Sequence, residues 1–191
     1  MNTMIDRVIR AAMLDKAFYN KVEADTSLTQ EALIVVILVS LAGSVGSFIG
    51  GMIGGNFGSA LLALIGSLIT GVVTYYIWAY VTYFVGTQLF GATADPGELL
   101  RVLGYASGPR ALSILSFIPC IGWLIALAGG IWALVAGFLG VREALDLDTT
   151  KTLITVVIGW VIIFVITAVV TAVLGVGAMG LGAAGSLLRG R

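Results

Sequence analysis

The chain contains no histidine and one cysteine among its 191 residues. A lone thiol, Cys120, excludes both an internal disulfide and a thiolate metal cluster, because each needs a second cysteine. Without histidine the chain also lacks the side chain most often used as a general base and as a metal ligand. We therefore expect a protein without a metal site, a bound cofactor or enzymatic activity.

Charged residues are also few. They make up 10% of the chain, whereas hydrophobic residues make up 59%, and a soluble domain carries about a quarter charged residues. The ten bases and ten acids cancel, and the bases form no dense patch of the kind that attracts nucleic acid. The composition predicts an integral membrane protein with no nucleic-acid partner.

Long uncharged runs predict the architecture. About 20 apolar residues in a helix cross a bilayer core of about 30 Å, and residues 32–175 hold five such segments. We predict an all-α, polytopic membrane bundle of five transmembrane helices. A cytoplasmic amphipathic segment (1–31) precedes it and a glycine-rich external tail (176–191) follows. The predicted spans are residues 32–54, 59–84, 99–118, 121–141 and 152–174.

Local signals mark several helix ends. Asp95-Pro96-Gly97-Glu98 has the composition of a helix start, with Asp95 as the N-cap, proline at the first position and an acid in the first turn. Pro119 is expected to end that helix in a tight turn. Asp148 is a similar N-cap candidate for the last span.

Basic residues lie at one end of the predicted spans. Cytoplasmic loops carry an excess of lysine and arginine, so we predict a cytoplasmic N-terminus and an external C-terminus. In a prokaryote the membrane would be the plasma or inner membrane. Eight of the ten bases then lie on or near the cytoplasmic side: Arg7, Arg10, Lys16, Lys21, Arg101, Arg110, Arg142 and Lys151.

The segment before the first span is amphipathic. Ile5, Val8, Ile9 and Ala12 share one helical face, and the neighbouring charged residues point away from it. Such a helix can lie in the cytoplasmic membrane interface. It can equally pack on the bundle as a short cytoplasmic helix.

Glycines recur at every fourth position of the first span and its following loop. Small residues at this spacing allow the backbone of another helix to approach closely. The stripe predicts either a homodimer seam or packing inside one bundle, and we favour the second. It consists of Gly46, Gly50, Gly54 and Gly58.

Arg110 is the most unusual residue of the predicted spans. It follows Pro109 and lies about 16 Å along the third span, counted from Leu99 in a straight helix. A cation at the bilayer centre costs between about 3 and 17 kcal/mol, and all ten acids fall outside the predicted spans. Arg110 can reach the cytoplasmic interface along a bent helix, or bind backbone carbonyls and tyrosine hydroxyls. It can also hold an anion such as a lipid phosphate. We favour the first two arrangements.

Aromatic and basic side chains near Arg110 complete the candidate site. Tyr76, Tyr80 and Tyr83 share one face of the second span, which is typical of an interfacial aromatic belt or of a hydroxyl-lined groove facing Arg110. The acids after the fourth span, around Glu143, are expected to be solvated rather than metal ligands. The candidate lipid, anion or partner site comprises Arg110, Arg101, Tyr105, Tyr76, Tyr80 and Tyr83.

Several short motifs resemble one family. They are Gly104-Tyr105-Ala106-Ser107-Gly108-Pro109, the turn at Pro119, Trp132, and Gly140-Val141-Arg142-Glu143. Over about residues 80 to 175 the chain is similar to the Yip (Ypt-interacting protein) membrane family. The resemblance implies a small helical membrane protein without catalytic activity. Eukaryotic members are linked to Rab-type GTPases and vesicle traffic. Their long N-terminal region and Asp-Leu-Tyr-Gly-Pro motif do not occur here, so the chain resembles the short prokaryotic branch and the GTPase role is not carried over.

Two functional classes follow. The first is a non-enzymatic membrane organiser or scaffold that binds lipids, another membrane protein or a second copy of the chain. The alternative is a channel or small-solute transporter. The spans offer serine and threonine but no buried acid or histidine for a proton relay. We therefore favour the organiser.

Overall fold

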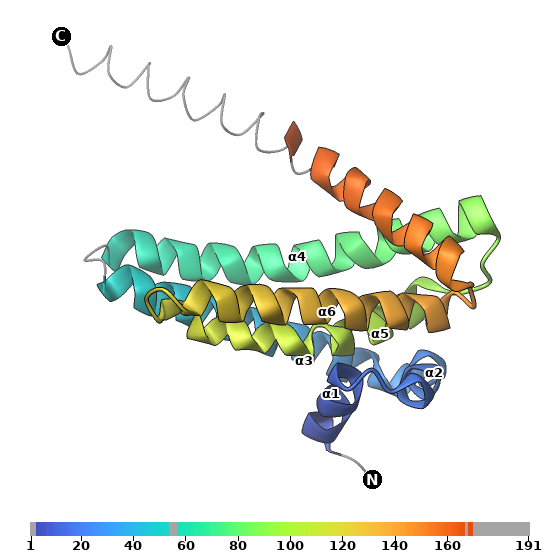
Figure 1. The fold of residues 1–191 in the computed structure, drawn as a ribbon, viewed down its shortest axis with the longest axis horizontal. Helices are drawn as coiled ribbons and strands as arrows, with labels where there is room; N and C mark the ends of the chain where they lie inside the picture. Colours follow the sequence, from blue (N-terminus) through green and yellow to red (C-terminus); the bar gives the residue numbers. More distant parts are fainter. Residues whose placement is uncertain (1–2, 54–56, 167, 170–191) are drawn as a thin grey trace.

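The computed structural model describes residues 3–53, 57–166 and 168–169. Over these residues the protein is helical and contains no strand (Figure 1). A last helix, Thr149–Ile166, follows α6. The preceding elements are α1 (Met4–Ala12), α2 (Lys16–Ala24), the 3-10 turn η1 (Thr26–Leu28), α3 (Thr29–Ile53), α4 (Phe57–Phe90), α5 (Pro96–Ala106), the 3-10 helix η2 (Gly108–Phe117) and α6 (Gly122–Ala144).

Among the described residues, four segments are long and apolar enough to cross a membrane: Thr26–Ile53, Leu64–Phe90, Gly122–Ala144 and Thr149–Ile166. They overlap the predicted spans 32–54, 59–84, 121–141 and 152–174, although the end of the last one lies outside the described residues, as does the predicted tail 176–191. Helix α3 packs against α4 on one side and against η2 on another, and η2 in turn packs against α6. The helix Thr149–Ile166 runs at an angle to α4 and α6 in the view of Figure 1. The prediction of an all-helical membrane bundle is confirmed for these four segments.

The helix that begins at Pro96 does not continue to Pro119 as predicted. The α-helix ends at Ala106, where the Ser107 hydroxyl donates to the Gly104 carbonyl oxygen at 2.7 Å. Gly108 and Pro109 follow, and proline has no N–H to continue the ladder of hydrogen bonds. The chain then winds more tightly as η2 and turns at Pro119 and Cys120, where Cys120 has a φ of 65°.

The broken segment nevertheless runs along most of α3. Gly104 is packed against Ala32 near one end of α3, and Phe117 is packed against Gly50 near the other. Between these contacts α3 rises about 27 Å. A 3-10 helix rises about 2.0 Å per residue, so the 13 residues from Gly104 to Phe117 cover about 25 Å rather than the roughly 20 Å of an α-helix. The tighter winding lets a short segment match α3 in length.

Helices α1 and α2 form a layer on the side of the bundle (Figure 1). Three side chains of α2, Phe18, Tyr19 and Val22, are buried in the core. Tyr19 packs on Gly140 of α6 and donates its hydroxyl to the Ala11 carbonyl oxygen of α1 at 3.1 Å. Because both helices share core residues with the bundle, the N-terminal layer is part of the same folded unit.

The predicted N-caps are present. The Asp95 side chain accepts from the backbone N–H of Gly97 and Glu98, and the Glu98 side chain accepts in return from the Asp95 N–H. The Asp148 side chain accepts from the Lys151 N–H at 2.9 Å. Each carboxylate satisfies N–H groups that have no partner within the helix.

Candidate functional site

Arg110 lies in a cleft with a volume of about 470 Å³. The cleft is bounded by α3, α4, α5, α6 and the helix Thr149–Ile166. Its polar lining consists of Arg110, Ser40, Thr74, Tyr75 and Ser107. Most of the remaining lining is apolar and includes Val36, Val39, Trp78, Leu103, Leu134, Phe138, Val156, Trp160, Ile163 and Phe164.

The guanidinium of Arg110 is not neutralised by the protein. Its backbone N–H donates to the Ser107 carbonyl oxygen at 2.9 Å. This hydrogen bond is part of the first turn of η2. Its side chain is exposed, and no hydrogen bond or ion pair connects it to any residue the structure describes. No carboxylate lines this cleft among the described residues. The cleft therefore carries a net positive charge.

The contact between Gly108 of η2 and α1 shows where Arg110 lies along the bundle. A Cβ atom added at Gly108 would lie 2.6 Å from Cγ1 of Val8, so α1 rests directly on the start of η2. Arg110 is two positions after Gly108 in the 3-10 helix, a rise of about 4 Å. Because α1 carries Asp6, Arg7 and Arg10, Arg110 lies close to the level of a charged surface helix rather than deep among the spans.

A second, apolar cavity of about 380 Å³ continues the cleft away from Arg110. It shares residues with the first along α6 and the helix Thr149–Ile166. Trp160 and Phe164 are 56% and 74% exposed, so the groove is open along its side. The shared residues are Leu134, Val156, Trp160 and Phe164.

The predicted tyrosine face does not meet Arg110. Tyr76 and Tyr80 are exposed on the outer surface of α4, and Tyr83 packs against the hydrophobic core. Tyr75 lines the cleft instead and donates its hydroxyl to the Leu100 carbonyl oxygen at 2.6 Å. The spacing of Gly71, Tyr75 and Trp78 along one helical face would have indicated this, since all three line the cleft.

Arg101, which we assigned to the same site, is buried elsewhere. It is 3% exposed, and its Nε donates to the carbonyl oxygens of Val22 and Glu23, each at 3.1 Å. These carbonyls belong to the last turn of α2, where helix geometry leaves them without an internal partner. Arg101 therefore caps α2 and attaches it to α5. No anion is needed to account for its charge.

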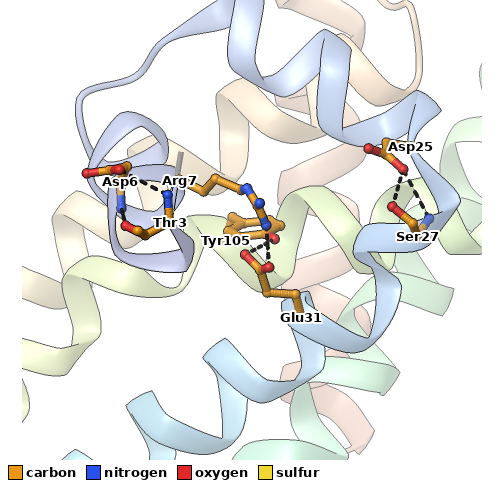
Figure 2. Close-up of polar contacts among 7 residues, drawn as sticks. All are labelled: Thr3, Asp6, Arg7, Asp25, Ser27, Glu31 and Tyr105. Carbon is orange, nitrogen blue, oxygen red and sulfur yellow. Dashed lines mark hydrogen bonds and ion pairs between the residues drawn. The ribbon is translucent and has the colours of Figure 1, made fainter. Parts of the chain in front are cut away.

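Tyr105 joins a polar cluster that connects three helices (Figure 2). Its hydroxyl donates to Oε1 of Glu31 at 2.7 Å, and Arg7 of α1 forms an ion pair with Oε2 of the same carboxylate. Figure 2 shows Arg7 and Tyr105 converging on Glu31. The Glu31 carboxylate at the start of α3 thus holds α1 against α5.

Glu23 of α2 lies in an acidic environment at the same end of the bundle. Burial raises the pKa of its carboxyl to about 7, and the negative charges of Asp146, Glu98 and Glu143 add to the effect. Its Oε2 is buried and has no hydrogen-bond partner among the described residues. Protonation of Glu23 near neutral pH would remove this uncompensated charge.

The glycine stripe packs inside the bundle where the structure describes it. A Cβ atom at Gly46 would lie 2.6 Å from the Ile114 carbonyl oxygen and 2.7 Å from that of Ser113, while Gly50 faces Phe117 at 3.8 Å. Both contacts are with η2, as the favoured interpretation requires. Gly54 lies outside the described residues, and the contacts of Gly58 are not described.

These features define an all-helical integral membrane protein with a helical N-terminal layer and a lateral cleft. Its family follows from sequence comparison. The family model of the Yip1 domain matches residues 12–186, so the chain belongs to the Yip1 domain family. No curated protein and no solved structure matches the chain.

Proposed function

We propose that this protein is a non-enzymatic membrane organiser that inserts the exposed apolar stripe of α1 into the cytoplasmic leaflet and so orders the lipids around its bundle. Membrane lipids are its first partners. Another membrane protein or a second copy of the chain is the further partner class. Membership of the Yip1 domain family supports this role, as do the four helices among the described residues that are long and apolar enough to cross a membrane.

One observation carries the proposal: α1 is attached to the bundle on one face and exposes an apolar stripe on the other. Val8 packs on Gly108, and the Ala12 carbonyl oxygen accepts from the Trp132 indole N–H at 2.6 Å. Ile5, Ile9 and Met13, one helical turn apart, are 65%, 50% and 73% exposed. An amphipathic helix of this kind buries its apolar face about 5–10 Å into the membrane interface.

The proposal includes five membrane crossings, with α5 and η2 together forming the third. The stretch from Gly104 to Phe117 that runs along α3 covers about 25 Å, close to the roughly 30 Å of the hydrocarbon core. The N-terminus is then cytoplasmic and the C-terminus external. In a prokaryote the membrane is the plasma or inner membrane.

A probe on α1 tests the proposal. In a Cys120→Ala background, Met13→Cys carries an environment-sensitive fluorophore after reconstitution into phosphatidylcholine–phosphatidylglycerol vesicles. We expect a lipid-like emission at position 13. We expect a water-like emission from Asn20→Cys, which replaces an exposed residue of α2. A water-like signal at both positions would show that α1 does not enter the membrane.

Vesicle shape provides the functional measurement. We expect vesicles that contain the wild-type protein to be smaller than protein-free vesicles when imaged by electron cryomicroscopy, because a helix inserted in one leaflet expands that leaflet. The double substitution Ile5→Asn and Ile9→Asn should restore the protein-free size. Equal sizes for both proteins would contradict the organiser role. Reproducible ion or solute flux through vesicles containing this protein alone would favour the channel alternative.

A further inference from the structure

We propose that the Arg110 cleft binds one anionic glycerophospholipid, with the lipid phosphate on the Arg110 guanidinium and an acyl chain in the apolar groove between α6 and the helix Thr149–Ile166. This site is separate from the exposed stripe of α1. The proposal therefore goes beyond the organiser function, and only its argument from depth rests on the proposed insertion of α1 into the membrane interface.

The first argument is electrostatic. A guanidinium without a counter-charge is expensive within a membrane protein, and among the described residues that line the cleft there is no carboxylate to offset Arg110. Arg110 also has no side-chain partner in the described part of the chain. An anion from outside the protein would compensate this charge.

The second argument is chemical. A guanidinium presents a planar set of N–H donors that matches two oxygens of a phosphate, and the resulting bidentate hydrogen bonds are strong. The hydroxyls of Ser40 and Thr74 line the same cleft and offer further donors. The cleft thus suits a phosphate diester. It offers no carboxylate to receive the ammonium of a choline or ethanolamine headgroup, which favours an anionic lipid.

The third argument is the depth of the cation. Arg110 lies about 4 Å beyond the contact between α1 and Gly108. If α1 lies in the membrane interface, the lipid phosphates of the same leaflet are at a similar level. An arginine side chain extends far enough to cover this difference, as charged side chains near membrane interfaces do.

The fourth argument is the apolar continuation of the cleft. Leu134, Val156, Trp160 and Phe164 line both cavities, so one continuous surface leads from the guanidinium to an apolar groove open to the side. The two volumes of about 470 Å³ and 380 Å³ fall in the range of ordinary ligand sites. A charged end joined to an apolar groove matches the amphiphilic shape of a phospholipid and not that of a free ion.

Native mass spectrometry of the full chain, extracted from vesicles of phosphatidylcholine with and without phosphatidylglycerol, tests the proposal. We expect one phosphatidylglycerol to remain bound to the wild type. Arg110→Gln should lower its affinity about tenfold or more. Arg110→Lys should also lose most of it, because lysine keeps the charge but not the bidentate geometry. Retention of the lipid by Arg110→Gln would overturn the proposal, as would full retention by Arg110→Lys.

Glycine substitutions test the groove with little risk to folding. A Cβ atom at Gly130, which lines the cleft, meets no atom within 4 Å, and the same is true at Gly66 of α4, which does not line it. Gly130→Leu should therefore displace the lipid from a folded protein, and Gly66→Leu should not. Equal binding by both variants would overturn the acyl-chain placement. Competition by inorganic phosphate as effective as that by phosphatidylglycerol would show a free-anion site and also overturn the proposal.

Discussion

At the scale of single residues, two arginines nine positions apart have opposite environments. Arg101 and Arg110 are both cations next to apolar sequence, and both were assigned to one candidate site. Arg101 is buried and donates to carbonyl oxygens of α2, whereas Arg110 is exposed in a cleft without a described partner. The difference arises because α2, which is distant in sequence, brings unpaired carbonyls to Arg101 alone.

Replacing Arg101 should loosen the N-terminal layer. We expect Arg101→Met to cost about 2–4 kcal/mol, because it leaves buried carbonyl oxygens without charged donors. Arg10→Met is the matched control, since the Arg10–Asp15 pair is partly exposed and such pairs contribute about 1 kcal/mol or less. Thermal unfolding in detergent micelles would measure both. Equal midpoints for the two variants would contradict the capping role of Arg101.

At the scale of elements, the packing of η2 depends on glycines of the neighbouring helices α3 and α6. Gly46 of α3 and Gly122 of α6 face backbone carbonyl oxygens of η2 at distances that leave no room for a Cβ atom. Close approach of backbones is a common way for helices to associate in membranes. The 3-10 helix η2 is therefore packed closely between α3 and α6 at glycine positions.

Substitution of Gly46 tests this packing. We expect Gly46→Ala to lower stability by about 1–3 kcal/mol, because its methyl group would overlap the carbonyl oxygens of Ser113 and Ile114. Gly66→Ala has open space around its Cβ position and should gain up to about 1 kcal/mol from helix propensity. Chemical or thermal unfolding of the two variants would decide. A Gly46→Ala variant as stable as wild type would show that η2 is not tightly packed on α3.

The attachment of α2 should depend on pH through Glu23. Its pKa is about 7 in the folded protein and about 4.5 when the carboxyl is unperturbed. The folded state therefore binds more protons between these values, and stability falls as the pH rises from about 4.5 through about 7. Glu23→Gln should remove this slope and should be more stable than wild type above about pH 7.

Thermal unfolding across a pH series, together with hydrogen exchange of α2, would measure the effect. Asp25→Asn provides the control, because the hydrogen bond from Ser27 lowers the pKa of Asp25 below its usual value and its titration falls outside the same window. The control should keep the wild-type slope. An unchanged slope in Glu23→Gln would contradict the assignment.

At the scale of the whole molecule, the broken third segment decides the topology. If α5 and η2 cross the membrane, positions 20 and 147 lie on the cytoplasmic side and position 188 on the outside. Asn20→Cys, Leu147→Cys and Leu188→Cys in a Cys120→Ala background, labelled in intact cells with a membrane-impermeant thiol reagent, would test this. We expect label at position 188 alone. Label from one side at all three positions would exclude five crossings.

Composition and the length of the apolar runs by themselves determined that this is a helical membrane protein. A run of about 20 uncharged residues is long enough to cross the bilayer, and in lipid a helix satisfies the hydrogen bonds of its own backbone. The sequence also predicted the N-caps at Asp95 and Asp148, since a cap depends on residues within one helical turn. Only tertiary structure decided the partners of Arg101, Tyr75 and Tyr105. Those outcomes depend on Val22, Glu23, Glu31 and Leu100, which are brought close by folding and by no local rule. The lateral cleft around Arg110 likewise exists because five helices, and not one segment, surround that side chain.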